Sequence, residues 1–188
     1  EHTVGCVVHG GASVPEPGVV LHKSGGMFLL GEPSHKASPR VSALADAIAA
    51  TGVNGKAVDD IHQEIWSKLL GNMGMGPIAV MTGATLIELA TDPDLRALSV
   101  SMMSEGKAVG EAFGLAMPMS AEERLDQGAT LGAFKPSILQ DYEKGRPMEI
   151  DALIGVLHEM GGMAGIPTPT IDAVLRVLRA LGRRAGTY

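Results

Sequence analysis

The sequence predicts a mostly α-helical protein with a small α/β segment at its start. Short Val-rich runs separated by Gly and Pro fill the first 57 residues, and apolar residues recur with helical spacing from residue 58 onward. Only 3% of the residues are aromatic, and 45% fall in the broad hydrophobic set. A core of Ala, Leu, Val, Ile and Met suits close helix-on-helix packing. At 188 residues the chain is long enough for one domain and a fraction of another.

The α/β segment is predicted to hold short strands and one helix. Thr3–Val8 is rich in Val and predicts a strand, in which Cys6 is expected to be a buried small hydrophobe. Pro15, Pro17 and Gly18 mark a loop. Val19–His22 and Met27–Leu30 predict a hairpin closed by a tight turn at Ser24-Gly25-Gly26. A helix over Pro39–Ala50 follows from the spacing of Val41, Leu44, Ala45 and Ile48.

The second part is predicted to contain about six helices. Asp59 and Asp60 open the first one, whose apolar stripe is expected to be Ile61, Ile65, Leu69 and Met73. Asp92 caps a helix that runs to Gly114, and Ser120 with Glu123 forms a capping box for the next. Three more are expected over residues 136–144, 149–163 and from Thr168 onward.

Composition excludes several classes of protein. The net charge of −6 and the scattered Lys and Arg argue against nucleic-acid binding. No apolar run reaches the length of a membrane helix. The six His are dispersed, so no metal site is expected, and no G-x-G-x-x-G or other common catalytic motif is present. One cysteine fits a reducing cytoplasm. Because residue 1 is Glu rather than Met, we expect the chain to be part of a longer protein.

The segment Glu64–Pro77 carries the first candidate residues. Lys68 and Asn72 are four residues apart and therefore share one helix face. Several Gly and a Pro crowd the same turns, which indicates either tight helix packing or backbone approach to a ligand. Periodicity alone favours a simpler interpretation, in which Lys68 forms a weak surface pair with Glu64.

The segment Lys135–Asp151 carries the second set. Ser137 follows Pro136 at a helix start, where its hydroxyl either caps the helix or binds an anion. Asp141 and Glu149 flank a turn, and Glu149 begins the next helix, where the helix dipole favours a carboxylate in any case. Nothing local makes either acid catalytic.

Taken in order, these segments resemble the ketopantoate reductase family over the whole chain. IWSKLLGN resembles its W-x-K-x-x-x-N helix, and KPSILQDYEKGRPMEID resembles its most specific motif. Residues 17–33 are similar to its late hairpin, residues 83–115 to the following pair of helices, and GIPTPTIDAVLRVL to its terminal helix. The KPSILQD and EID segments argue against the related 6-phosphogluconate and 3-hydroxyacid dehydrogenases.

The resemblance implies a division into two domains and a set of site residues. Residues 1–57 would be the last strands and helix of a Rossmann-type NADP-binding domain, and residues 58–188 the helical domain that mediates homodimer formation. Family members reduce a 2-keto acid, ketopantoate, to pantoate with NADPH. By position, Lys68 would be the catalytic lysine and Asn72 and Ser137 substrate-binding residues. Glu149 would line the site and contact substrate or cofactor hydroxyls, whereas the main cofactor loop lies outside this sequence.

Two positions depart from the family pattern. Gly76 and Phe134 stand where asparagines are expected. This places the ketopantoate assignment in doubt more than the type of reaction. Two alternatives therefore remain open: a reductase of another 2-keto acid, and a helical dimerisation module without catalysis of its own.

Overall fold

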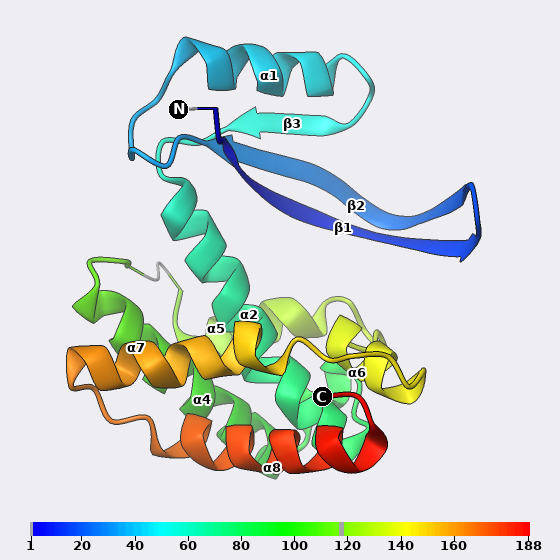
Figure 1. Cartoon of the computed structure of the whole chain (residues 1–188), viewed down its shortest axis with the longest axis vertical. Helices are drawn as coiled ribbons and strands as arrows, with labels where there is room; N and C mark the ends of the chain where they lie inside the picture. The colour runs from blue at the N-terminus through cyan, green and yellow to red at the C-terminus, as the bar shows by residue number, and fades with distance from the viewer. Residues whose placement is uncertain (1, 117–118) are drawn as a thin grey trace. The chain divides into compact units, whose positions relative to one another are not determined.

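The computed structural model describes residues 2–116 and 119–188, which form two compact units, Glu1–Ile65 and Trp66–Tyr188 (Figure 1). Helix α2 (Ile61–Thr82) begins in the first unit and continues through the second. The mostly helical fold is confirmed. The division between the units falls inside α2, whereas the sequence-based boundary at residue 57 lies just before that helix.

The first unit is a three-stranded sheet with one helix. Strands β1 (Gly5–Glu16) and β2 (Val19–Gly31) are antiparallel, and β3 (Asn54–Ala57) runs parallel to the end of β2 (Figure 1). Helix α1 (Pro39–Ala49) connects β2 to β3 and packs Val41 and Ala45 against Leu30. Parallel neighbours require such a crossover connection. The helix was predicted, but the four-residue strand β3 was not.

The predicted hairpin is wrong in its turn position. β2 is one continuous strand through Gly25 and Gly26, and the turn lies at Pro17-Gly18, between the paired residues Glu16 and Val19. Gly25 pairs with Gly10 beside a shift in register, and its φ of +71° is one that other residues rarely adopt. A Cβ at Gly25 would lie 2.6 Å from the carbonyl oxygen of His9. The glycines therefore make β-bulges across the hairpin instead of a turn.

Cys6 lies in the predicted strand but is exposed, so the expectation of burial is wrong. Side chains alternate between the two faces of a strand. Val7 takes the inward face and packs against Leu29 and Ile61, which leaves Cys6 on the other face.

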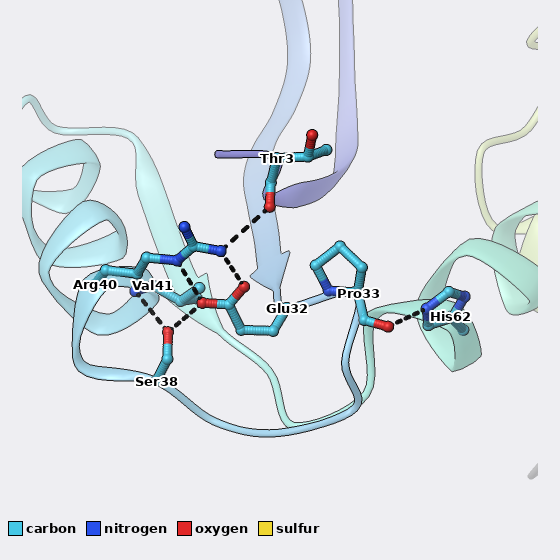
Figure 2. Close-up of polar contacts among 7 residues, drawn as sticks. All are labelled: Thr3, Glu32, Pro33, Ser38, Arg40, Val41 and His62. Carbon is cyan, nitrogen blue, oxygen red and sulfur yellow. Dashed lines mark hydrogen bonds and ion pairs between the residues drawn. The ribbon is translucent and has the colours of Figure 1, made fainter. Parts of the chain in front are cut away.

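A buried carboxylate fastens the start of α1 to the end of β2 (Figure 2). Glu32 is 6% exposed and accepts hydrogen bonds from Ser38 Oγ, from Arg40 Nε (2.6 Å) and from Arg40 Nη2 (2.5 Å). Ser38 also caps α1, because its Oγ accepts a hydrogen bond from Val41 N at 3.3 Å. Arg40 Nη2 further donates to Thr3 O at 3.4 Å. The hydrogen bonds from Arg40 and Ser38 lower the pKa of Glu32 to about 2.

The second unit is a bundle of helices that continues from α2. Its further elements are α3 (Leu86–Thr91), α4 (Pro93–Ala112), α5 (Ala121–Ala129), α6 (Ser137–Glu143), the π-helical turn η1 (Asp151–Gly155), α7 (Val156–Ala164) and α8 (Pro169–Ala185). The predicted caps are confirmed, with Asp92 accepting hydrogen bonds at the start of α4 and Ser120 with Glu123 forming the capping box of α5. The carboxylate of Glu105 on α4 accepts from Thr170 N and Ile171 N and so fixes the start of α8.

The predicted apolar stripe of α2 is partly wrong. Met73 is fully buried as expected, but Ile65 is 45% exposed, and Trp66 and Leu70 are the residues that enter the helical core. From residue 73 to residue 80 every side of α2 is buried. A helix that is surrounded by others has no single apolar face, and the i, i+4 pattern in its sequence therefore misassigns the contacts.

Substitution of Gly110 by Ala should destabilise the helical unit by about 1–3 kcal/mol, because overpacking in a core costs that much. The new Cβ would lie 2.2 Å from Nε1 of the buried Trp66 ring. Gly162→Ala on α7 is the matched control, since nothing lies within 4 Å of its Cβ position and the residue is exposed. The control should stabilise by up to about 1 kcal/mol. Urea unfolding of both variants measures the difference, and equal midpoints would contradict the close packing of α2 on α4.

Glu32→Gln should remove a pH-dependent contribution to the stability of the first unit. The pKa of Glu32 in the folded chain, about 2, lies below its ordinary value of 4.5. Its ionised form therefore stabilises the fold above pH 4.5, and this stabilisation is lost as the pH falls from 4.5 toward 2. Amide exchange in β2 and α1 at a series of pH values measures this. Wild type should lose protection across that window and the variant should not, while Glu16→Gln, at an exposed position, should behave as wild type.

Candidate functional site

Helix α2 is the element on which the helical unit is assembled, and α4 covers one of its sides. The two helices approach so closely that glycine is needed at the contacts. A Cβ at Gly106 would lie 2.6 Å from Leu70 Cδ2, and one at Gly74 would lie 2.3 Å from Met103 Cγ. The sequence placed several Gly in these turns, and tight helix packing is confirmed as one reason for them.

Two shorter helices contact α2 on its remaining flanks. On the α5 flank, a Cβ at Gly71 would lie 2.1 Å from Nη2 of Arg124, and one at Gly128 would lie 2.7 Å from Met75 Sδ. On the α6 flank, a Cβ at Gly76 would lie 2.8 Å from Ile138 Cγ2.

Lys68 and Asn72 lie between these two flanks. Successive residues of an α-helix are rotated by about 100°, so these two side chains differ by about 40° around the axis. On the same wheel Gly71 and Met75 fall to one side of them and Gly76 to the other. Lys68 is half-buried and Asn72 is exposed. We call the surface of α2 through Lys68 and Asn72 the Lys68 strip.

Ser137 lies next to a residue of α6 that contacts α2. It is the first residue of α6 and is exposed, and its neighbour Ile138 is the side chain that packs on Gly76, one turn beyond Asn72. The loop before α6 is held in place by a hydrogen bond from Leu86 N to Phe134 O at 3.0 Å. Lys68, Asn72 and Ser137 thus come from two helices in contact.

Glu149 is positioned by its two neighbours in sequence. Met148 and Ile150 are buried, and Met148 N donates to Thr187 O at 2.8 Å, while Glu149 itself is exposed. The carbonyl of Glu149 accepts from Leu153 N at 3.0 Å and so leads into the π-helical turn. The backbone at Glu149 is therefore held by hydrogen bonds and buried neighbours, and contact of its carboxylate with substrate or cofactor hydroxyls stays a prediction.

Other charged residues of the Lys135–Asp151 segment stabilise its local conformation through ion pairs. Arg146 forms an ion pair with Asp141, and its N–H donates to Asp141 O at 2.9 Å around the turn. Lys135 Nζ lies 2.5 Å from Glu143 Oε1, which joins the loop before α6 to the last residue of that helix. These contacts explain the charges of the motif without giving them a chemical role.

Within residues 2–116 and 119–188, no cluster of three or more His, Cys, Asp or Glu has the arrangement of a metal site. Nor does any helix in that part of the chain have the length and apolar character that crossing a membrane requires.

Residues 60–182 match the protein family described as "Ketopantoate reductase PanE/ApbA C terminal". The chain belongs to the ketopantoate reductase family. Its whole length is 43% identical to a 2-dehydropantoate 2-reductase of Mesorhizobium japonicum, of which it covers 58%. The crystal structure of 2-dehydropantoate 2-reductase from Methylococcus capsulatus matches with a TM-score of 0.89 at 26% identity, over 98% of this chain and 64% of that one. The chain thus spans less than two thirds of these relatives.

The fold is also shared by D-mandelate dehydrogenase, solved in complex with NADH. That structure matches with a TM-score of 0.82 at 23% identity, over 91% of this chain and 59% of that chain. At this identity the likeness concerns the fold alone.

The structure explains one of the two departures from the ketopantoate reductase pattern. Gly76 is buried, and a Cβ there would lie 2.8 Å from Ile138 Cγ2, so an asparagine would require the Ile138 side chain to shift. Phe134 is 39% exposed and contributes its carbonyl to α3, and nothing in the structure explains why a phenylalanine stands there.

Gly76→Ala should destabilise the chain by about 1 kcal/mol or more, because the branched Ile138 side chain is too stiff to move aside. Ile138→Ala should recover part of this loss in the double variant, since it deletes the methyl group that the new Cβ meets. A double-mutant cycle in urea measures the coupling between the two residues. Strictly additive effects would contradict the contact.

Proposed function

We propose that this chain forms the substrate-binding and proton-donating side of an NADPH-dependent 2-keto acid reductase that converts ketopantoate to pantoate. Membership of the ketopantoate reductase family supports the proposal. The observation that supports it is that Lys68 and Asn72 share the face of α2 between its contacts with α5 and α6, and that Ser137 precedes the α6 residue Ile138, which approaches Gly76. In this proposal residues 1–57 complete a Rossmann-type domain whose phosphate-binding loop lies outside this chain, and residues 58–188 are the helical domain.

Lys68 is proposed as the catalytic acid. When bound, the nicotinamide supplies a hydride to the carbonyl carbon of the substrate. The carbonyl oxygen gains negative charge as that C–H bond forms, and the Lys68 ammonium stabilises this charge and transfers a proton to the oxygen. The product is a 2-hydroxy acid, and Lys68 regains its proton from solvent. A half-buried lysine suits this role because partial exclusion of water strengthens its electrostatic effect.

The other site residues are proposed to hold the reactants in place. The side-chain amide of Asn72, one turn after Lys68, can donate to a substrate oxygen. The Ser137 hydroxyl is proposed to bind the substrate carboxylate. Glu149 is the residue of this chain that fits the cofactor, because an exposed carboxylate on an ordered backbone can accept hydrogen bonds from ribose hydroxyls. Such positioning lowers the entropic part of the barrier.

A second candidate is the reduction of a different 2-keto acid. It is favoured by Gly76 and Phe134, which remove two amides expected around the substrate. In either case we propose a cytoplasmic homodimer that associates through the helical domain.

Lys68→Ala should lower kcat with ketopantoate by about 10²–10⁴-fold, the usual contribution of a positioned proton donor. The measurement is oxidation of NADPH by the full-length protein that carries this chain, with a panel of branched and unbranched 2-keto acids. Lys107→Ala is the matched control, because Lys107 is also half-buried and forms an i, i+4 pair with Glu111, with no other ion pair among the described residues. The control should retain wild-type turnover.

Two results would count against the proposal. Unchanged turnover in Lys68→Ala, with its thermal unfolding preserved, would remove Lys68 from the chemistry. Wild-type activity confined to another 2-keto acid would replace ketopantoate as the substrate and leave the reaction type standing.

A further inference from the structure

Arg124 on α5 places its guanidinium directly on the backbone of α2. A Cβ at Gly71 would lie 2.1 Å from Arg124 Nη2, 2.5 Å from Cζ and 2.9 Å from Nε. The charged group, and not only its alkyl stem, therefore occupies the space over Gly71. The contact between Arg124 and Gly71 is not predictable from the sequence, because the capping box is the only local feature that marks α5 there.

This guanidinium has no carboxylate partner among the residues that the structure describes. The three acidic residues of α5 act elsewhere: Glu123 accepts from Ser120 N at 2.8 Å, Asp126 pairs with Arg96 at 2.5 Å, and the charge of Glu122 helps to raise the pKa of Arg96. Burial lowers the pKa of Arg124, and no attraction to an anion opposes that effect. By contrast, Arg40, Arg96, Arg146 and Arg179 each form an ion pair with a carboxylate.

The position of Gly71 relates Arg124 to the proposed site. Gly71 directly precedes Asn72 and lies three residues after Lys68, a spacing that makes neighbours on a helix surface. Arg124 therefore adds a second positive charge on the α5 side of the Lys68 strip. The opposite, α6 side carries the Ser137 hydroxyl.

We propose that Arg124 is a further binding residue, which holds an anionic group of the ligand seated on the Lys68 strip. The inference rests on the proposed function. Two groups share the required chemistry, the carboxylate of the 2-keto acid and the diphosphate of the cofactor, and a guanidinium can bind either through two parallel hydrogen bonds. A partly buried cation without a partner has lost part of its hydration, and a bound anion compensates for that loss.

The test compares Arg124→Met and Arg124→Lys in the full-length protein. Arg124→Met keeps an unbranched side chain as far as the position of Nε and removes the guanidinium charge, so KM for the anion that Arg124 binds should rise about 10- to 100-fold while kcat changes little. Arg124→Lys keeps a charge without the planar fork and should fall between wild type and Arg124→Met. Arg176→Met on α8 is the control, because Arg176 is exposed and outside the site.

The two KM values separate the sources of the anion. A higher KM for the 2-keto acid assigns Arg124 to the substrate carboxylate, and a higher KM for NADPH assigns it to the cofactor diphosphate. An active Arg124→Met enzyme with both KM values unchanged would overturn the inference and leave Arg124 as a packing residue. A wild-type protein that reduces no 2-keto acid would instead overturn the proposed function, and the inference with it.

Discussion

Close backbone contact along α2 is the constraint on which the helical unit depends. α4, α5 and α6 all approach α2 at glycines, so that side chains such as Leu70, Trp66 and Ile138 occupy space that a Cβ would otherwise fill. The density of such a core makes each contact sensitive to a single methyl group. The contact also has a cost, because the buried Trp66 Nε1 faces Gly110 with no acceptor in the described residues.

The same packing determines which side chains of α2 remain accessible. α2 is enclosed by helices from residue 73 to residue 80, and the accessible side chains before that stretch include Lys68 and Asn72. Because α4, α5 and α6 all pack closely on α2, the backbone that carries these two side chains is held in place by contacts elsewhere on the helix. The proton-donor role proposed for Lys68 would benefit from this arrangement, since the backbone position does not depend on the substrate.

Local signals in the sequence were sufficient for most of the helices, but not for the short helix α3 or for the contacts between elements. The caps at Asp92 and Ser120 were predictable because the interacting atoms lie within three residues of one another. The turn at Pro17-Gly18, the bulge at Gly25 and the strand β3 depend on a partner strand, so the Gly pair was misread as a turn. Lys68, Asn72 and Ser137 are predicted site residues that rest on family resemblance, and the contact of α6 with α2 is visible only in the structure.

The proposed role of Arg124 is not predictable from the sequence pattern, because it depends on the residues that surround the guanidinium in the folded chain. A residue kept only to cover Gly71 could be a methionine or leucine, which would fill the space without taking a charge out of water. A guanidinium at that place, beside the half-buried Lys68 and without a carboxylate among the described residues, raises the local positive potential. Gly71 is therefore both a packing contact of the core and the place where the Arg124 charge lies. Binding of a negatively charged ligand would neutralise that charge without disturbing the packing.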